Sequence, residues 1–471
     1  MSIPLKNQRS ATRPFTGAFY LTVWRWHFYA GIIVAPFVIF LAITGGIYLW
    51  KPQYEAWRYR DLFSAPITKT ASVSVDAQLR AAESAMSAGW SAQTFQPAFL
   101  AGQTAQIVFK STAGRNASTQ PVTVFVDPTT GRVVGQLDDK TRFMRLIHDL
   151  HGTLLAGKTG EYIVEFAASW ALVLFLTGLY LWWPRPKFAV WGFLLPRLRS
   201  SGRTFWRDVH AVPAVWLSVG TLFLLTTGLL WSQVSGQWYR TISATFGQGT
   251  PRESSSGAHR SELTGWSPPL KAGLAEKIDA LASSAPGHEG HGSGAAAITG
   301  ARSEAALPLD RVIAIANEQR VPQPYAIALP VGERGVYSVL SDRNQAFNRT
   351  YLHLDQYSGR ILADVRFKDF GYLAKFGLWG IIAHEGQLFG LANQILGTVA
   401  AAGVLLLAFS GLAMWWLRRP EDRFFAPASD TPLPPVVFVG TLLLACLLPL
   451  LGASLVLGWL FDRVMARRFS A

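Results

Sequence analysis

Long apolar runs alternate with two polar segments along this chain of 471 residues. As a helix, each apolar run is long enough to cross a hydrocarbon core of about 30 Å. Each polar segment contains a helical stretch, at 75–88 and 309–319, followed by alternating, strand-like runs. In each, an Asp followed four residues later by Gly-Arg, at 127–132 and at 355–360, predicts a hairpin turn. The pattern predicts a polytopic α-helical membrane protein with two α+β domains outside the bilayer. The predicted spans are roughly 28–50, 162–183, 211–234, 394–417 and 435–460.

The last apolar run has two interpretations. It is long enough for a fifth span, but Pro449 and Gly452 interrupt it, and a re-entrant hairpin is the alternative. With five spans, the basic residues near the C-terminus would lie on the side opposite the other basic loops. The side on which the C-terminus lies therefore stays open.

The predicted organisation has five parts. They are the N-terminal tail and first span (1–51), a first outer domain (52–142), an elbow helix with the second span, a loop and the third span (143–238), a second outer domain (239–370), and an elbow with the remaining apolar segments (371–471).

The first and third spans repeat one another. Thr44 and Gly45 follow His27 by 17 and 18 residues, and Thr227 and Gly228 follow His210 at the same distances. The repeat predicts an imidazole at the same depth in two helices.

The second and fourth spans also repeat. Gly178 follows His151 by 27 residues, and Gly411 follows His384 by the same number. Each unit runs span, outer domain, elbow histidine and span. Because both units have the same orientation, we predict a parallel internal repeat about an axis along the membrane normal.

The four histidines of the repeat are the candidate site. A titratable side chain at membrane depth needs a partner. A two-fold axis would oppose His27 with His210 near one face, and His151 with His384 near the other. Two opposed imidazoles are what low-spin haem iron needs as axial ligands. We therefore predict two haem sites, with His151 and His384 as the catalytic outer pair.

Small residues accompany both pairs. Over 17 residues a helix rises about 25 Å, which places Gly45 and Gly228 near the outer pair and Gly178 and Gly411 near the inner pair. A flat macrocycle needs such room, although small residues are also common at ordinary helix contacts in membranes. The sequence has no Cys-x-x-Cys-His, so the predicted haems are non-covalent, b-type groups.

His148 lies three residues before His151, on the same helical face. The two cannot occupy opposite sides of one iron. We favour His151 as the ligand and assign His148 a supporting or substrate-contacting role.

The net charge of +14 bears on topology. Lys and Arg cluster beside apolar spans, in the N-terminal tail and in the loop 184–210, which is typical of cytoplasmic segments and gives nucleic-acid binding little support. The two polar segments then face the opposite side, the periplasm of a Gram-negative bacterium. The basic tail leads into a run long enough to span, so we expect an uncleaved first helix. The single cysteine, Cys446, excludes disulfides and Fe–S clusters within one chain.

A Gly/Ser/Ala-rich insertion covers about 250–305 and predicts a mobile loop. Within it, His288 and His291 form a possible metal chelate, although a flexible, low-complexity loop is the more ordinary interpretation. His353 is expected to be a strand residue, and His259 receives no role.

Other functional classes have weaker support. The sequence has no glycine-rich phosphate loop before a helix and no His-Glu-x-x-His motif, and Glu165 is the only acid within the first four spans. The alternatives that remain are a non-enzymatic membrane sensor or regulator that binds a partner, and a metal permease.

Several motifs together resemble a known family. They are Trp-Arg-x-His at 24–27 with its downstream Thr-Gly, His-Asp-Leu-His-Gly-x-Leu from 148, Gly-Leu-Tyr-Leu-Trp-Trp at 178–183, Pro-Leu-Leu-Gly-x-Ser-Leu from 449 and Asp-Pro-x-Thr-Gly-Arg at 127–132. The chain resembles the PepSY-associated transmembrane-helix family of iron-regulated bacterial membrane proteins, including its ferrisiderophore reductases. The resemblance implies two periplasmic PepSY-like domains, haem b, and an inner-membrane enzyme that reduces ferric siderophores. It leaves open the siderophore and the electron donor, cytoplasmic or quinol.

Overall fold

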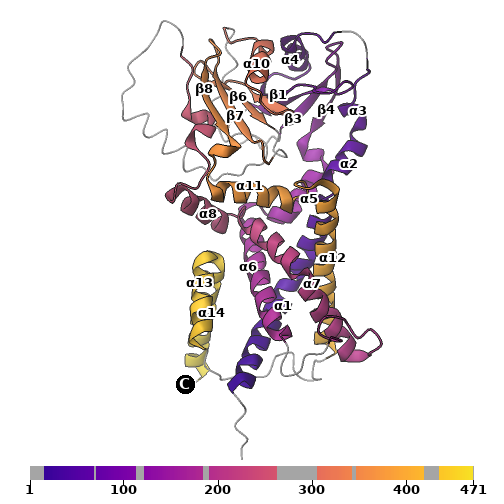
Figure 1. Ribbon diagram of the computed structural model, residues 1–471, viewed down its shortest axis with the longest axis vertical. Helices are drawn as coiled ribbons and strands as arrows, with labels where there is room; N and C mark the ends of the chain where they lie inside the picture. The colour runs from indigo at the N-terminus through magenta and orange to yellow at the C-terminus, as the bar shows by residue number, and fades with distance from the viewer. Residues whose placement is uncertain are drawn as a thin grey trace, which may run out of the picture. The chain divides into compact units, whose positions relative to one another are not determined.

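The computed structural model describes residues 15–67, 71–112, 121–183, 190–262, 305–341, 346–417 and 434–469. The chain divides into two compact units, each built from segments far apart in sequence (Figure 1). The first unit comprises Met1–Gly46, His151–Gly236 and Ile395–Ala471, and the second comprises Ile47–Leu150 and Gln237–Gln394.

Four helices of the described chain are long and apolar enough to cross a membrane. Their apolar windows contain few or no charged residues, so lipid and neighbouring helices can cover every face. The corresponding four predicted spans are confirmed. The helices are α1 (Phe15–Tyr48), α6 (Gly157–Trp182), α7 (Gly202–Leu229) and α12 (Gly390–Trp416).

The predicted fifth span is instead two helices, α13 (Pro435–Leu447) and α14 (Pro449–Phe469), which pack against each other (Figure 1). The chain leaves the helical conformation at Leu448, with φ −120° and ψ 86°, because Pro449 disfavours the α region at the residue before it. Of the two interpretations, the hairpin is therefore the one found. Helix α14 also packs on α6, where the Trp170 indole donates to the Ser454 hydroxyl at 3.1 Å.

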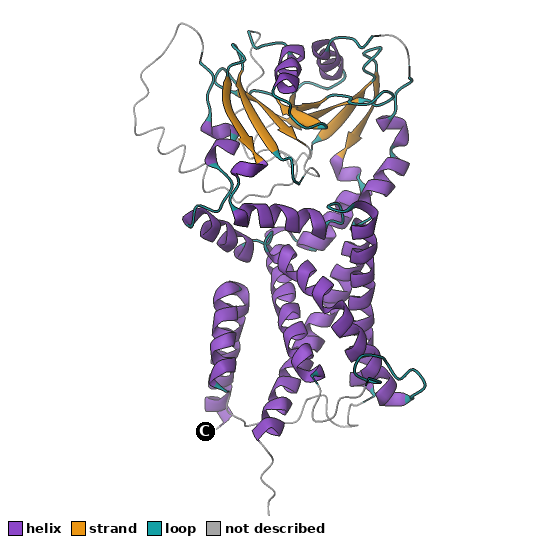
Figure 2. Ribbon diagram, viewed as in Figure 1, coloured by secondary structure: helices purple, strands orange, loops and turns teal. Residues whose placement is uncertain are grey.

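The second unit contains one antiparallel sheet of eight strands among the described residues (Figure 2). Its order is β4-β3-β2-β1-β5-β6-β7-β8, so two four-stranded meanders meet edge to edge. The junction is short: Thr94 pairs with Ala328 and Phe95 with Ile327. The two segments predicted as separate domains thus share one sheet. Its strands are β1 (Trp90–Gln96), β2 (Ala105–Ser111), β3 (Val122–Val126), β4 (Val133–Asp138), β5 (Tyr325–Ala328), β6 (Val336–Ser341), β7 (Thr350–Asp355) and β8 (Ile361–Arg366).

Helices α4 (Val75–Ser84) and α10 (Leu309–Glu318) contact each other and share one core with a face of this sheet (Figure 2). Both helices were predicted from the sequence. Because side chains alternate along a strand, Val124 and Val126 join this core while Phe125 packs on the other face with Tyr59 and Leu137.

The Asp-x-x-x-Gly-Arg motifs form the predicted hairpins between β3 and β4 and between β7 and β8. Asp127 accepts hydrogen bonds from Thr129 and Thr130, and Gly131 takes the left-handed conformation at φ +72°. Burial alone would raise the pKa of Asp127, but these hydrogen bonds outweigh it and lower the pKa.

Short helices connect the sheet to the apolar helices in the sequence. They are α2 (Lys51–Arg58), α3 (Arg60–Phe63), η1 (Asp139–Thr141), α5 (Phe143–Thr153), α8 (Val234–Thr245), η2 (Arg252–Ser254), η3 (Ser256–Ala258), η4 (Phe367–Asp369) and α11 (Tyr372–His384).

The start of the predicted insertion is ordered against the sheet, contrary to the expectation of a mobile loop from residue 250. The Ser261 hydroxyl donates to the Gly335 carbonyl at 2.6 Å, and the Glu262 amide donates to the Asp355 carboxylate at 2.9 Å. These bonds attach residues 252–262 to the second meander. The rest of the insertion lies outside the described residues.

Candidate functional site

His27 and His210 lie close together in the first unit. His27 belongs to α1 and His210 to α7. Their ring centroids are 6.2 Å apart, and the ring planes are nearly perpendicular, at 84°. The structure thus brings together the two histidines predicted as the inner pair.

Hydrogen bonds define the tautomer of His27. Its Nδ1 lies 2.9 Å from the Thr177 hydroxyl oxygen on α6. Thr177 uses its single hydroxyl proton on a backbone carbonyl of its own helix, that of Val173 at 2.7 Å. The oxygen can therefore only accept from His27, so Nδ1 carries the proton and Nε2 keeps a free lone pair.

The same reasoning applies to His210. Its Nδ1 lies 2.9 Å from the Leu407 carbonyl and 3.1 Å from the Ser410 hydroxyl, both on α12. A carbonyl can only accept, and Ser410 donates its proton to the Leu406 carbonyl. His210 is therefore also protonated on Nδ1, which leaves Nε2 able to bind a metal.

His151 has an equivalent partner at the other end of α1. Its Nδ1 lies 3.0 Å from the Thr44 hydroxyl, and Thr44 donates to the Phe40 carbonyl at 2.9 Å. Three of the four candidate histidines thus share one arrangement, in which a threonine or serine of another helix accepts from Nδ1. The Thr-Gly spacing is visible in the sequence, but this role of the hydroxyl groups is not.

The glycine after each hydroxyl residue lies against the same imidazole. A Cβ on Gly178 would come within 3.2 Å of His27 Cε1, one on Gly411 within 3.4 Å of His210 Cε1, and one on Gly45 within 3.0 Å of His151 Cε1. The sequence suggested that these glycines make room for a macrocycle. The structure provides a nearer reason, since each glycine lets an imidazole approach the backbone of a neighbouring helix.

A tight elbow joins α5, which carries His151, to α6. Leu154 and Leu155 adopt left-handed conformations at φ 50° and 57°. Gly160 passes so close to the Thr153 carbonyl that any side chain there would overlap it. The close approach of the two helices therefore requires glycine at position 160.

A buried carboxylate with two partly exposed arginine partners supports the start of α7, two residues before His210. The Asp208 side chain is 1% exposed and accepts from the Arg197 guanidinium at 2.7 and 3.0 Å and from Arg207 at 2.7 Å. The loop ahead of α7 is thereby attached to the helix.

Glu165, the single acid noted in the spans, also has a defined contact. Its carboxylate, on α6, accepts from the backbone amides of Val234 at 2.9 Å and Ser235 at 2.7 Å. It therefore caps the N-terminus of α8, where the helix dipole favours a negative charge.

The remaining predicted histidines lie in the second unit or outside the described residues. His384 is the last residue of α11, and because it belongs to the second unit its pairing with His151 stays a prediction of the sequence. His148 lies beside Tyr48, at 5.6 Å between ring centroids, and burial lowers its pKa. His288 and His291, the possible chelate, lie outside the described residues.

His353 is a buried residue of β7, as its strand pattern predicted. Its Nδ1 lies 2.8 Å from the Ser338 hydroxyl and its Nε2 lies 3.0 Å from the Ser254 carbonyl. His259 lies against it with ring centroids 4.9 Å apart. Burial, and to a smaller extent the neighbouring His259, lower the pKa of His353 to about 4, although the hydrogen bond to the Ser254 carbonyl acts in the opposite direction. Sequence reasoning missed the approach of these two histidines, because it depends on the folding of 252–262 onto the sheet.

The ring separation of the inner pair would allow both imidazoles to hold one iron between them. Two metal–imidazole bonds of about 2 Å each, with about 1 Å from nitrogen to ring centre on either side, would separate the centroids by about 6 Å. The separation of 6.2 Å agrees with this value. No group of three or more His, Cys, Asp or Glu side chains in the described chain could hold a bare metal ion. Haem needs only two protein ligands, since the macrocycle supplies the rest.

The four apolar helices and the antiparallel sheet define the class: a membrane protein with a soluble α+β region. The model of the PepSY-associated TM region matches residues 24–418, most of the chain. The protein belongs to this family. No curated protein matches the chain.

Proposed function

We propose that this protein is a two-haem reductase of the bacterial inner membrane, which passes electrons across the bilayer to ferric siderophores. The observation that carries the proposal is the pair His27 and His210, with ring centroids 6.2 Å apart and both Nδ1 atoms held as donors. These residues would be the axial ligands of an inner haem b. Haem at such a site supplies one-electron transfer.

The proposal of an outer site rests on the contacts of His151 and on the repeat. His151 has the hydrogen-bond arrangement of the inner ligands, through Thr44. The repeat assigns the opposing position to His384. It also predicts that Thr227 would accept from His384 as Thr44 accepts from His151, and that Gly228 would make room for the imidazole as Gly45 does. The Thr227 hydroxyl donates to the Phe223 carbonyl at 2.6 Å, as Thr44 does to Phe40, so its oxygen is likewise restricted to accepting.

Charge and connectivity support the orientation. The loop between α6 and α7 is rich in arginine, which favours the cytoplasm. The second unit connects the opposite ends of the spans, α1 to α6 and α7 to α12, and would then lie in the periplasm. The reversal at Pro449 returns the chain to the side from which α13 starts, so the basic C-terminal sequence agrees with this orientation.

The chemistry suits iron release. With haem bound, the His27/His210 site would take up an electron from a cytoplasmic or quinol donor, and the His151/His384 site would supply it to one ferric ion in a chelate, which would become ferrous. The siderophore itself is unchanged. Hard oxygen ligands hold ferrous iron less tightly than ferric iron, so release follows without cleavage of the chelator.

The test is the visible spectrum and haem content of the purified full-length protein. We expect about two haems b per chain, reduced by dithionite and reoxidised by a ferric hydroxamate. His259→Ala, a change outside the candidate ligands, should leave the spectrum unchanged. Protein without haem would exclude the reductase and favour the sensor or the permease. If the reduced haem is not reoxidised by a ferric hydroxamate, ferric siderophores of this type are not the substrate.

A further inference from the structure

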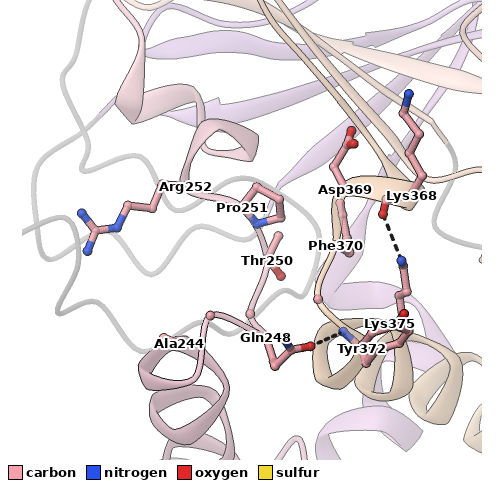
Figure 3. Close-up of a pocket in the computed structure, with 13 residues that line it drawn as sticks. Ala244, Gln248, Thr250, Pro251, Arg252, Lys368, Asp369, Phe370, Tyr372 and Lys375 are labelled. Atoms are coloured by element: carbon pink, nitrogen blue, oxygen red, sulfur yellow. Dashed lines mark hydrogen bonds between the residues drawn. The ribbon is translucent and has the colours of Figure 1, made fainter.

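A cavity of about 560 Å³ lies in the second unit, between the end of α8, the loop after it and the start of α11 (Figure 3). The loop and the helix start are connected, since the Gly371 amide donates to the Gly249 carbonyl at 3.1 Å and the Tyr372 amide to the Gln248 side chain at 2.9 Å. All of its lining residues belong to this unit, and none is a candidate haem ligand.

The ionisable lining side chains are mostly basic. They are Arg252, Lys368 and Lys375, with Asp369 as the acid among the described lining residues. The Asp369 carboxylate accepts from the Arg366 backbone amide at 2.9 Å, so part of its charge is already engaged.

Lys375 is held in place. Its ammonium donates to the Lys368 carbonyl at 3.0 Å, as Figure 3 shows, and lies 5.4 Å from the centre of the Phe367 ring and 5.5 Å from that of Tyr372. An ammonium group has three protons, and this carbonyl takes one. The positioned cation therefore keeps donors for an anion, and ordering it costs little entropy on binding.

We propose that this cavity binds an oxyanion, a phosphate or carboxylate group, with Lys375 as its main contact; the Arg252 side chain points away from Lys375 in Figure 3 and contributes positive charge at longer range. The proposal is independent of the haem sites. Its ligand could be the headgroup of an anionic phospholipid or a soluble anion, because both present the same charged oxygens.

The surroundings favour the lipid. Helix α8, whose end lines the cavity, begins in the sequence five residues after the end of α7, a candidate membrane span. Tyr372, which lines the cavity, is 81% exposed, and two aromatic side chains of α8 and the residue after its end are exposed as well, Trp238 at 47% and Phe246 at 71%. Aromatic and basic residues together are typical of the headgroup layer.

The experiment uses the full-length protein in nanodiscs. One arm compares phosphatidylcholine discs with discs that contain phosphatidylglycerol, and native mass spectrometry counts the lipids that stay bound. The other arm titrates inorganic phosphate into phosphatidylcholine discs and follows the midpoint of thermal unfolding. The variants are Lys375→Gln and Arg252→Gln, and Lys140→Gln is the control. Lys140 is an exposed lysine of η1, the 3-10 helix after β4, and η1 occupies the same place in the first meander as η4 does in the second, after β8.

We expect the Lys375→Gln protein to bind the anion roughly tenfold more weakly, the effect of losing one charge-assisted hydrogen bond. Arg252→Gln should have a smaller effect and the control none. If Lys375→Gln loses bound phosphatidylglycerol but keeps the response to phosphate, the ligand is a lipid headgroup. If it loses only the response to phosphate, the ligand is a soluble anion. No preference for phosphatidylglycerol together with no phosphate response, or equal binding by all variants, would overturn the proposal.

Discussion

Asp76 and Asp310 each cap the helix that carries the other. The Asp310 carboxylate accepts from the Val75 amide at the start of α4 at 3.1 Å, and the Asp76 carboxylate accepts from the Leu309 amide at the start of α10 at 2.8 Å. Each acid therefore satisfies a backbone donor that its partner helix leaves free. The contact is therefore reciprocal between the helix that precedes the first meander and the helix that precedes the second.

The contact predicts coupling between residues more than 230 positions apart. Asp310→Ala should weaken the start of α4 by about 1 kcal/mol, the usual cost of a lost helix cap. Hydrogen exchange should rise in peptides near Val75, and Asp76→Ala should raise exchange near Leu309. Asp61→Ala changes an acid whose side chain is 92% exposed and serves as control. Exchange that changes only beside the mutated residue would show that the caps do not support each other's helices.

Local patterns made much of this fold predictable. Apolar composition identified the four long helices, and the Asp and Gly-Arg positions identified both terminal hairpins, because each signal lies within a few residues of the element that it describes. The joining of the two meanders was not predictable in the same way. It rests on two residue pairs between β1 and β5, in a strand pattern no different from that of any sheet edge.

The candidate site was partly predictable for the same reason. Equal spacing in the two halves singled out His27 and His210, and the structure places their rings close together. The hydroxyl partners Thr177 and Ser410 come from two other helices, so their contacts depend on helix packing, which a single sequence does not reveal. The choice of a hairpin at Pro449 also depends on packing, here of α14 against α6.

The ligand pairs should be separable by mutation. His27→Ala and His210→Ala should each remove the same spectral component, because both imidazoles would bind one iron. His151→Ala and His384→Ala should remove the other component. Difference spectra of the four purified variants provide the measurement. If His27→Ala and His151→Ala abolish one common component, the ligands pair within a repeat and the two-fold assignment is wrong.

Protonation of His353 should loosen the segment 252–262. Its pKa is about 4 in the fold, against 6.5 for an exposed histidine. Above pH 6.5 both states are neutral and the group has no effect. As the pH falls from 6.5 towards 4, His353 binds a proton in the unfolded state but stays neutral in the folded state. The free energy of unfolding therefore falls by at most roughly 3 kcal/mol.

Hydrogen exchange of 252–262 in wild type and in His353→Gln tests this pH dependence. Glutamine keeps a donor and an acceptor but does not titrate. The ratio of the wild-type exchange rate to the variant exchange rate should therefore increase as the pH is lowered from 6.5 to 4. A constant ratio over this range would mean that His353 does not control the segment.

The hydroxyl partner of His27 should matter more than that of His210. Thr177→Val removes the hydroxyl that accepts the hydrogen bond of His27 Nδ1. Ser410→Ala leaves His210 its 2.9 Å bond to the Leu407 carbonyl. Loss of such a partner typically weakens metal binding 10- to 100-fold and makes the imidazole a poorer donor to iron.

Thr177→Val should therefore lower retention of the inner haem and raise its midpoint potential, which redox titration of the purified protein measures. Ser410→Ala should do so less, and Thr177→Ser should restore the wild-type value. Equal shifts in Thr177→Val and Ser410→Ala would contradict the difference in hydrogen bonding, and no shift in either would show that these hydroxyl groups do not set the properties of the inner site.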